Sequence, residues 1–129
     1  MGILIDSSVL VAYERRGRGL EALREQEAAI SAITASEMLH GVHRARTEAQ
    51  RRPRAEFVEL LLAALPILPL DLQVARVHAQ IWANLAGRGQ KIGAHDLLIA
   101  ATAMAHRHSL ATLNRDEFSR IEGLSLVTL

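Results

Sequence analysis

The stretch GILIDSSVL, residues 2–10, gives the first indication of the fold. Its apolar start is short and continuous, which is typical of a strand that is buried on both faces. Asp6 ends this run, and Ser7 or Ser8 can cap a helix that we expect to reach about Tyr13. A buried strand that leads directly into a helix favours a parallel α/β fold.

The same alternation of short apolar runs and helical patterns continues along the chain. We expect strands at residues 2–5, 28–31, 67–68, 110–113 and 124–129. We expect helices at about residues 7–13, 20–26, 34–45, 54–65, 72–86 and 95–106. This alternation predicts an α/β fold, a three-layer α/β/α sandwich with a short parallel central sheet.

Three polar or cyclic residues indicate where helices begin. The segment TASE, residues 34–37, has the form of a capping box between Thr34 and Glu37. Pro53 is expected in the first turn of the next helix, where a missing N–H is tolerated. Asp71 is expected to cap the helix that follows it.

Length and composition indicate one compact domain over residues 1–129, and the half of the residues that are apolar can form a core. The absence of cysteine excludes a disulfide scaffold, a thiolate metal site and a cysteine nucleophile. The longest apolar run, residues 60–70, contains two prolines and is too short to span a bilayer. The apolar start lacks the basic stretch of a secretory signal. We therefore expect a cytoplasmic protein with no membrane partner.

The net charge of +1 does not by itself indicate a nucleic-acid-binding protein. Fourteen of the fifteen basic residues are arginine, however, and many of them occur in two clusters. The clusters are Arg15, Arg16 and Arg18, and then Arg44, Arg46, Arg51, Arg52 and Arg54. Such clusters either hold phosphates or are solvated helix ends, and the sequence leaves both interpretations open.

Three aspartates occupy positions that core packing would not favour, and one glutamate accompanies them. Asp6 and Asp116 each follow a predicted strand, at the edge where parallel sheets bind ligands. Asp96 begins a helix that is otherwise nearly all apolar, and Glu37 lies in the first turn after another strand. In a sheet of this kind the four side chains can converge, whereas Asp71 remains a helix cap.

Clustered carboxylates repel one another, which raises their pKa values unless a cation compensates. Oxygen ligands alone favour Mg²⁺ or Mn²⁺, and these ions can activate water for attack on a phosphodiester. Each acid taken singly also has a purely structural interpretation. Asp6 can be a turn or cap residue, and Glu37 can complete the capping box. Asp96 can be a favourable charge at a helix N-terminus, and Asp116 can be an ordinary loop acid.

Four segments in order resemble the motifs of PIN-domain ribonucleases. ILIDSSVL (3–10) resembles the opening strand that ends in Asp, and ITASEMLHG (33–41) is similar to the second motif. IGAHDLLIAA (92–101) resembles the third motif, and LNRDEFSRIEGL (113–124), preceded by Thr112, resembles the closing segment. The resemblance spans nearly the whole chain and is close to the VapC toxins of VapBC toxin–antitoxin pairs, some of which cut initiator tRNA.

The resemblance implies a Mg²⁺-dependent endoribonuclease, with Mn²⁺ as the alternative ion. It implies that Asp6, Glu37 and Asp96 are the catalytic acids and that Asp6 and Asp96 bind the metal. The fourth acid is either Asp116 or Glu117, because Asn114 stands where some PIN domains have an aspartate; we favour Asp116. The supporting residues expected around these acids are Ser7, Thr112, Asn114 and Glu117.

The resemblance also implies an RNA substrate, a homodimer and a cognate VapB-type antitoxin whose peptide tail covers the site. The residues expected to contact RNA phosphates are Arg15, Arg16, Arg18, Arg44 and Arg46. A housekeeping PIN nuclease and a non-catalytic RNA-binding or regulatory module are the alternatives. The second would lack an acid and expose aromatic side chains for stacking, whereas we expect Phe57, Trp82 and Phe118 in the core.

Overall fold

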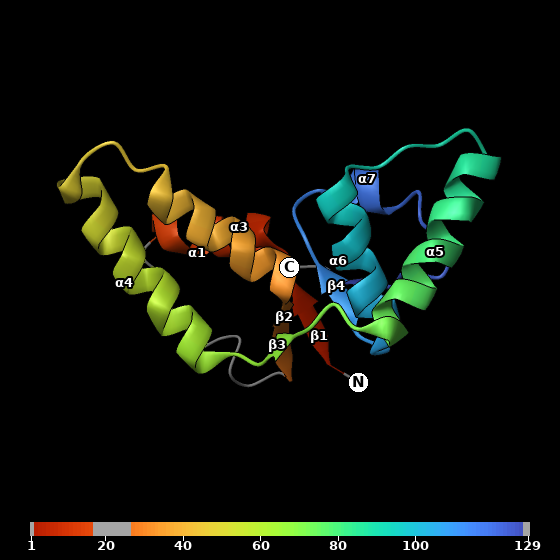
Figure 1. Ribbon diagram of the computed structural model, residues 1–129, viewed down its shortest axis with the longest axis horizontal. Helices are drawn as coiled ribbons and strands as arrows, with labels where there is room; N and C mark the ends of the chain where they lie inside the picture. The colour runs from red at the N-terminus through yellow and green to blue at the C-terminus, as the bar shows by residue number, and fades with distance from the viewer. Residues whose placement is uncertain (1, 17–26, 128–129) are drawn as a thin grey trace.

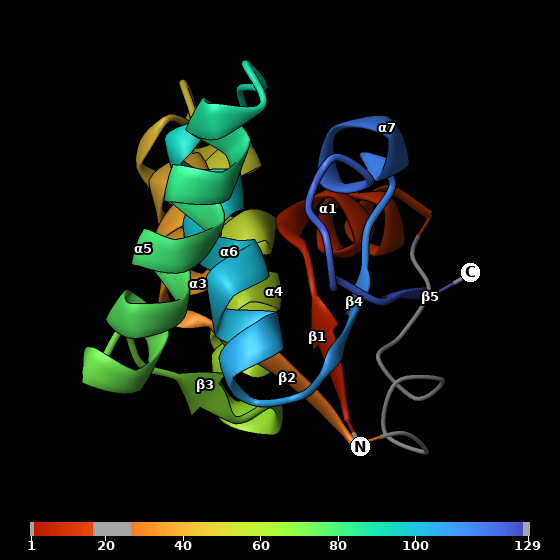
Figure 2. The ribbon, with the colours of Figure 1, turned by 90° about the vertical axis from the view of Figure 1, so that its right-hand side faces the viewer.

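The computed structural model describes residues 2–16 and 27–127. Its sheet consists of five parallel strands in the order β3-β2-β1-β4-β5. They are β1 (Ile3–Ile5), β2 (Ala28–Ser31), β3 (Ile67–Leu68), β4 (Ser109–Ala111) and β5 (Leu126–Val127). Figure 2 shows β1 between β2 and β4, at the centre of the sheet. The five predicted strands and their parallel arrangement are confirmed.

Helices cover both faces of this sheet. Those in the described residues are α1 (Ser7–Arg16), α3 (Ala32–His43), α4 (Glu48–Ala64), α5 (Leu72–Gly87), α6 (Ala94–Ala105) and α7 (Arg115–Phe118). Helices α1, α3 and α4 lie on one side of the sheet, and α5, α6 and α7 lie on the other (Figure 1). The predicted three-layer sandwich is therefore confirmed. The helix predicted at residues 20–26 lies outside the described residues.

The central strands are apolar throughout because both of their faces are buried. Successive side chains of a strand point to opposite faces of the sheet. Leu4 and Leu110 accordingly join the core beneath α5 and α6. Their neighbours Ile5 and Ala111 join the core beneath α1, α3 and α4. The strand ends are thus anchored on two sides, which holds the carboxyl edge of the sheet in place.

Helix α3 begins earlier than the capping box predicted. Ser31 is its N-cap, and the Ser31 Oγ accepts a hydrogen bond from the Thr34 N–H at 3.1 Å. The capping-box interpretation of Thr34 and Glu37 is wrong, because Ser31 is at once the last residue of β2 and the cap of α3. Glu37 therefore does not form the predicted capping box.

Helix α4 also begins earlier than expected. Its N-cap is Thr47, whose side chain accepts a hydrogen bond from the Gln50 N–H at 3.2 Å. Pro53 therefore lies inside the helix and not in its first turn as predicted. The ring removes one backbone donor there. Helix α1 runs to Arg16, three residues beyond the predicted end at Tyr13.

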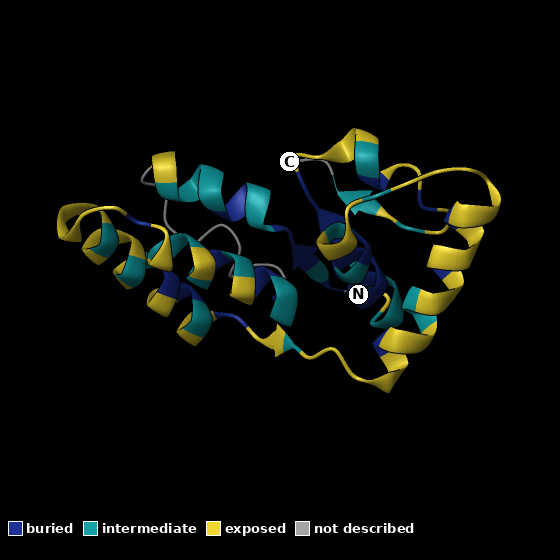
Figure 3. Ribbon diagram, turned by 45° about the horizontal axis from the view of Figure 1, so that its top comes forward, coloured by how far each residue is buried: buried dark blue, intermediate teal, exposed yellow. Residues whose placement is uncertain are grey.

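Helix α5 begins as predicted, since the Asp71 Oδ1 accepts a hydrogen bond from the Val74 N–H at 3.1 Å. The prediction that Trp82 belongs to the core is wrong, because this residue is 61% exposed. Figure 3 shows that much of the surface of α5 is exposed. Phe118 is fully buried, as expected. Among the described helices, none is long and apolar enough to cross a membrane.

Candidate active site

The candidate site lies at the carboxyl edge of the parallel sheet. Asp6 follows the end of β1, and Thr112 follows the end of β4. The Asp6 N–H donates to the Ala111 carbonyl at 2.9 Å, which joins the two strand ends. Asp96 in the first turn of α6 and Glu37 in α3 lie close enough to interact with Asp6 or with each other. The predicted convergence of these three acids is therefore present in the structure.

Asp6 is a buried carboxylate, 2% exposed, held by two hydroxyl groups. Its Oδ2 accepts hydrogen bonds from the Ser8 Oγ at 2.7 Å and the Thr112 Oγ1 at 2.8 Å. Those two hydroxyls are oriented in turn by backbone groups. The Leu113 N–H donates to Ser8 at 3.0 Å, and the Asn114 N–H donates to Thr112 at 3.0 Å. Because each hydroxyl oxygen accepts from the backbone, its own proton is directed to Asp6.

This arrangement distinguishes the two oxygens of Asp6. Both hydroxyl donors reach Oδ2, and among the described residues no hydrogen bond from a side chain reaches Oδ1. A buried carboxylate is stable only when it is hydrogen-bonded or paired with a cation. The side chain is therefore fixed through one oxygen and offers the other to a ligand.

Glu37 is held between α1 and α6 and is 29% exposed. Its Oε1 accepts a hydrogen bond from the Ser7 Oγ at 3.2 Å, and its Oε2 lies 3.6 Å from the His95 Nδ1. Ser7, predicted as a supporting residue, thus contacts Glu37 and not Asp6. Glu37 is more exposed than Asp6 and lies at the edge of the site.

Asp96 is half-buried and has the most perturbed ionisation in the site. Burial, followed by the negative charges of Asp6, Glu117 and Glu37, raises the pKa of Asp96 from 3.8 to about 7. A helix N-terminus favours the charged form of an acid, so burial and the neighbouring acids outweigh that effect. A carboxylate in this condition favours either a proton or a bound cation.

Glu117, and not Asp116, is the fourth acid that the structure places beside Asp96. The negative charge of Glu117 contributes to the raised pKa of Asp96, and the Glu117 Oε1 accepts the Gly93 N–H at 2.8 Å. Asp116 is exposed. The sequence favoured Asp116, but α7 was not predicted, and in a helix successive side chains point in different directions. The role of Asp116 as the fourth acid stays a prediction, and Glu117 is the one of the two whose charge acts on Asp96.

The oxygen donors of the site fit a hard divalent cation. Among the described residues, no three His, Cys, Asp or Glu side chains close around a single point, so the protein does not form a complete cage. Mg²⁺ needs no such cage, because it usually keeps several waters and binds through one or two carboxylates. The free Oδ1 of Asp6 and the carboxylate of Asp96 can supply those ligands, and a cation would offset the repulsion that raises the pKa of Asp96.

The arginines expected to contact phosphates lie away from the acids. Arg15 and Arg16 end α1. Arg44 and Arg46 lie in the turn that joins α3 to α4, and we call these two helices with their turn the α3–α4 arm (Figure 1). All four are exposed. In the described part of the chain no ion pair reaches Arg44 or Arg46. Arg18 lies outside the described residues.

Sequence reasoning missed Ser8 as a partner of Asp6. It placed a hydroxyl residue there only as an alternative helix cap, whereas the Ser8 Oγ donates to the Asp6 Oδ2. The doubled serine after Asp6 was the available signal, because a hydroxyl two residues from an aspartate can reach its side chain. The role of Gly93 N–H had no sequence signal, since its acceptor Glu117 is 24 residues away.

With the geometry described, the chain can be compared with known proteins. The family model of the PIN domain matches residues 3–124. This chain belongs to the PIN-domain family. Ribonuclease VapC1 of Rickettsia felis is 38% identical to it, over 100% of this chain and 97% of that protein. The resemblance found in the four motifs is thus confirmed.

Two further relatives are similar to this PIN domain. The tRNA(fMet)-specific endonuclease VapC of Salmonella typhimurium is 35% identical over 97 residues, which cover 75% of this chain and 71% of that protein. The crystal structure of VapBC2 from Rickettsia felis bound to a DNA fragment from their promoter matches with a TM-score of 0.89 and 26% identity. That match covers 100% of this chain and 99% of the other, so the two folds agree throughout.

Proposed function

We propose that this PIN domain is the ribonuclease toxin of a toxin–antitoxin pair and hydrolyses RNA phosphodiester bonds with Mg²⁺ or Mn²⁺. The observation that carries the proposal is the state of Asp96, whose pKa of about 7 results from burial and three neighbouring acids at the sheet edge. Such a cluster is suited to bind a divalent cation. The ribonuclease VapC relative supports RNA as the substrate, and the tRNA(fMet)-specific relative supports tRNA.

The residues of the site take distinct roles in this proposal. Asp6 and Asp96 would hold the ion, which when bound would activate water and stabilise charge on the phosphodiester. Asp6 is kept in one orientation by Ser8 and Thr112. Glu37 is accessible and anchored by Ser7, so it can accept the proton of the attacking water. Glu117 positions the first turn of α6 through the Gly93 N–H.

A polar hollow beside Glu117 offers a place for the RNA backbone. It has a volume of about 530 Å³ and is lined by Leu113, Asn114, Arg115, Asp116, Glu117 and Arg120. The Arg115 side chain donates to the Val127 carbonyl at 2.8 Å, and that of Arg120 donates to the Lys91 carbonyl at 2.8 Å. Carbonyl groups orient these guanidinium groups without neutralising them, so both can attract phosphate. Arg44 and Arg46 would contact phosphates farther along a long RNA.

The proposed partner is an antitoxin that occupies the acid site. A similar solved structure, VapBC-5 from Mycobacterium tuberculosis, is a member of the VapBC family of toxin–antitoxin systems. An arginine or lysine from an antitoxin tail could pair with Asp6 and Asp96 in place of the ion, since a cation of either kind relieves their repulsion. Apolar contacts outside the acid site would give most of the affinity, because exposed ion pairs contribute little.

The activity can be tested with synthetic initiator tRNA, mapping the cut ends after incubation with Mg²⁺, Mn²⁺ or EDTA. We expect cleavage with either ion and none in EDTA. Asp96→Asn should lower the rate at least about 100-fold. Asp71→Asn is the matched control and should retain activity, because Asn also caps a helix and Asp71 lies outside the site. Equal cleavage by Asp96→Asn, or cleavage that persists in EDTA, would contradict the proposal.

A further inference from the structure

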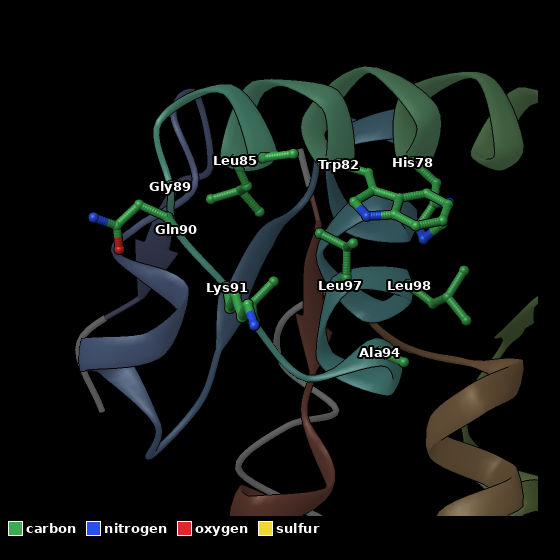
Figure 4. Close-up of a pocket in the computed structure, with 11 residues that line it drawn as sticks. His78, Trp82, Leu85, Gly89, Gln90, Lys91, Ala94, Leu97 and Leu98 are labelled. Atoms are coloured by element: carbon green, nitrogen blue, oxygen red, sulfur yellow. The ribbon is translucent and has the colours of Figure 1, made fainter.

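The first turn of α6 has an apolar face and a polar face. Ala94 lines an apolar hollow between α5 and α6 together with Leu97 and Leu98, as Figure 4 shows. Successive residues of a helix point about 100° apart, so the two residues after Ala94 are directed away from this hollow. They are His95 and Asp96, and neither of them lines it. Asp96 is one of the acids of the site, and His95 is the polar residue beside it.

His95 reaches from α6 to the acid on α3. Its Nδ1 lies 3.6 Å from the Glu37 Oε2. The two helices pack together here, because Ile33, one turn before Glu37, packs against the core cluster that contains Leu97. A distance of 3.6 Å is longer than a hydrogen bond, but a ring N–H and a carboxylate still attract each other at this range. Such contacts in a free enzyme often shorten when the substrate binds.

This contact restricts Glu37 more than it stabilises the fold. The side chain of His95 is 62% exposed, and pairs that are so accessible to water contribute little to stability. A glutamate side chain, however, has many rotamers to lose. The Ser7 Oγ donates to the Glu37 Oε1 at 3.2 Å, and one such contact leaves the carboxylate free to turn about that oxygen. A second group beside Oε2 fixes the plane of the carboxylate.

The backbone that carries His95 is itself anchored. The Gly93 N–H donates to the Glu117 Oε1 at 2.8 Å, and the Gly93 carbonyl accepts the Leu97 N–H at 2.9 Å. These two bonds tie the first turn of α6 to α7 and to the rest of its own helix. His95 shares this turn with Asp96. A carboxylate that contacts His95 is therefore held at a set position relative to Asp96.

We propose that His95 is a positioning residue, which holds the Glu37 carboxylate in the orientation that accepts a proton from the attacking water. Its effect on the rate rests on the proposed function, whereas the orientation of Glu37 is a property of the metal-free chain. Each carboxylate oxygen has two lone pairs, so Oε2 can face His95 and still accept a proton. His95 acts through Glu37 and not as a metal ligand, because Mg²⁺ and Mn²⁺ favour oxygen donors.

Cleavage of synthetic initiator tRNA tests the effect on the rate. His95→Ala should lower kcat about 10-fold and leave KM within about twofold, because it removes an orientation and no contact with RNA. His95→Asn places an amide nitrogen near the position of Nδ1 and should restore kcat to within about threefold of wild type. His43→Ala removes an exposed histidine at the end of α3 and should keep kcat. In a Glu37→Gln background, His95→Ala should change the residual rate less than about twofold.

NMR relaxation of the Glu37 side-chain carbons in the metal-free chain tests the orientation without any cleavage. The order parameter should fall in His95→Ala and keep its wild-type value in His95→Asn and His43→Ala, with circular dichroism showing that all variants are folded. Equal order parameters in wild type and His95→Ala would overturn the proposal. A raised KM in His95→Ala, or a loss of rate that persists beside Glu37→Gln, would show direct contact with RNA and also overturn it. If the wild-type chain cleaves no RNA, the proposed function fails, and the order parameters alone decide the role of His95.

Discussion

At the scale of single residues, the site depends on how each carboxylate is surrounded. Asp6 is more deeply buried than Asp96, but it receives two hydroxyl hydrogen bonds. Asp96 is flanked by other acids, and the pKa of Asp96 is raised to about 7. Two carboxylates with such different partners can hold one cation in different ways, because two hydroxyl groups hold Asp6 in one orientation, whereas Asp96 exchanges a proton for the ion.

The raised pKa of Asp96 predicts a pH-dependent stability in metal-free solution. The folded chain holds this proton more tightly than the unfolded chain, whose Asp96 has a pKa near 3.8. The stabilisation is therefore complete below about pH 4 and is lost as the pH rises to about 7. Asp96→Asn removes the titrating group. In EDTA we expect its Tm to exceed that of the wild type by about 3–6 °C at pH 8 and to match it at pH 4.

Thermal unfolding followed by circular dichroism at pH 4, 6 and 8 would check this expectation. Asp71→Asn serves as the control, since Asn preserves the helix cap and the position lies away from the acid cluster. If the Tm of the wild type and that of Asp96→Asn change with pH in the same way, the pKa of Asp96 is not raised in the folded chain.

The contrast between Glu117 and Asp116 gives a second prediction at this scale. Glu117→Gln removes a negative charge that contributes to the raised pKa of Asp96, whereas Asp116→Asn changes an exposed side chain. We expect Glu117→Gln to lower the cleavage rate about 10- to 100-fold and Asp116→Asn less than about threefold. Glu117→Gln should also lower the pKa of Asp96, which carboxyl-carbon NMR can measure. A larger loss in Asp116→Asn would return the fourth acid to that position.

At the scale of elements, the junction between β2 and α3 sets the position of Glu37. Ser31 is fully buried, and its Oγ accepts the Thr34 N–H at 3.1 Å. Ser31→Ala leaves that buried N–H without its acceptor, so we expect the free energy of unfolding to fall by about 1–2 kcal/mol. Urea unfolding can measure the change. Ser36→Ala, at an exposed position of the same helix, should stay within about 0.5 kcal/mol of wild type. Equal effects of the two variants would exclude a capping role for Ser31.

At the scale of the whole molecule, charge is distributed in two opposing regions. The acids gather at the sheet edge, whereas Arg44 and Arg46 stand at the tip of the α3–α4 arm. A net charge of only +1 gives weak overall attraction to RNA, so local cations must supply most of it. A long RNA that contacts both regions would be held by its phosphates at the arm and cut at the acids.

This distribution predicts a specific salt dependence of RNA binding. In an Asp96→Asn background, Arg44→Ala and Arg46→Ala should each reduce the slope of log Kd against log salt by about 0.7, the value for one lost phosphate contact on a single strand. Fluorescence anisotropy with labelled tRNA at several KCl concentrations can measure the slopes. Arg44→Lys keeps the charge and should keep the slope. An unchanged slope in both alanine variants would show that the arm does not contact the RNA.

The sequence alone predicted the layered α/β architecture, the Asp71 cap of α5 and the convergence of three acids. Continuous apolar strands need cover on both faces, and parallel strands end at one edge, so Asp6 and Glu37 were expected near one edge, where Asp96 could join them. Only the tertiary structure decided that Glu117 joins them, because α7 turns its neighbour Asp116 away. It also decided that Trp82 is exposed. An apolar stripe on a helix has the same sequence pattern whether it is buried in the core or exposed on the surface. Only the packing of α5 against α6 decides which of its apolar residues are buried.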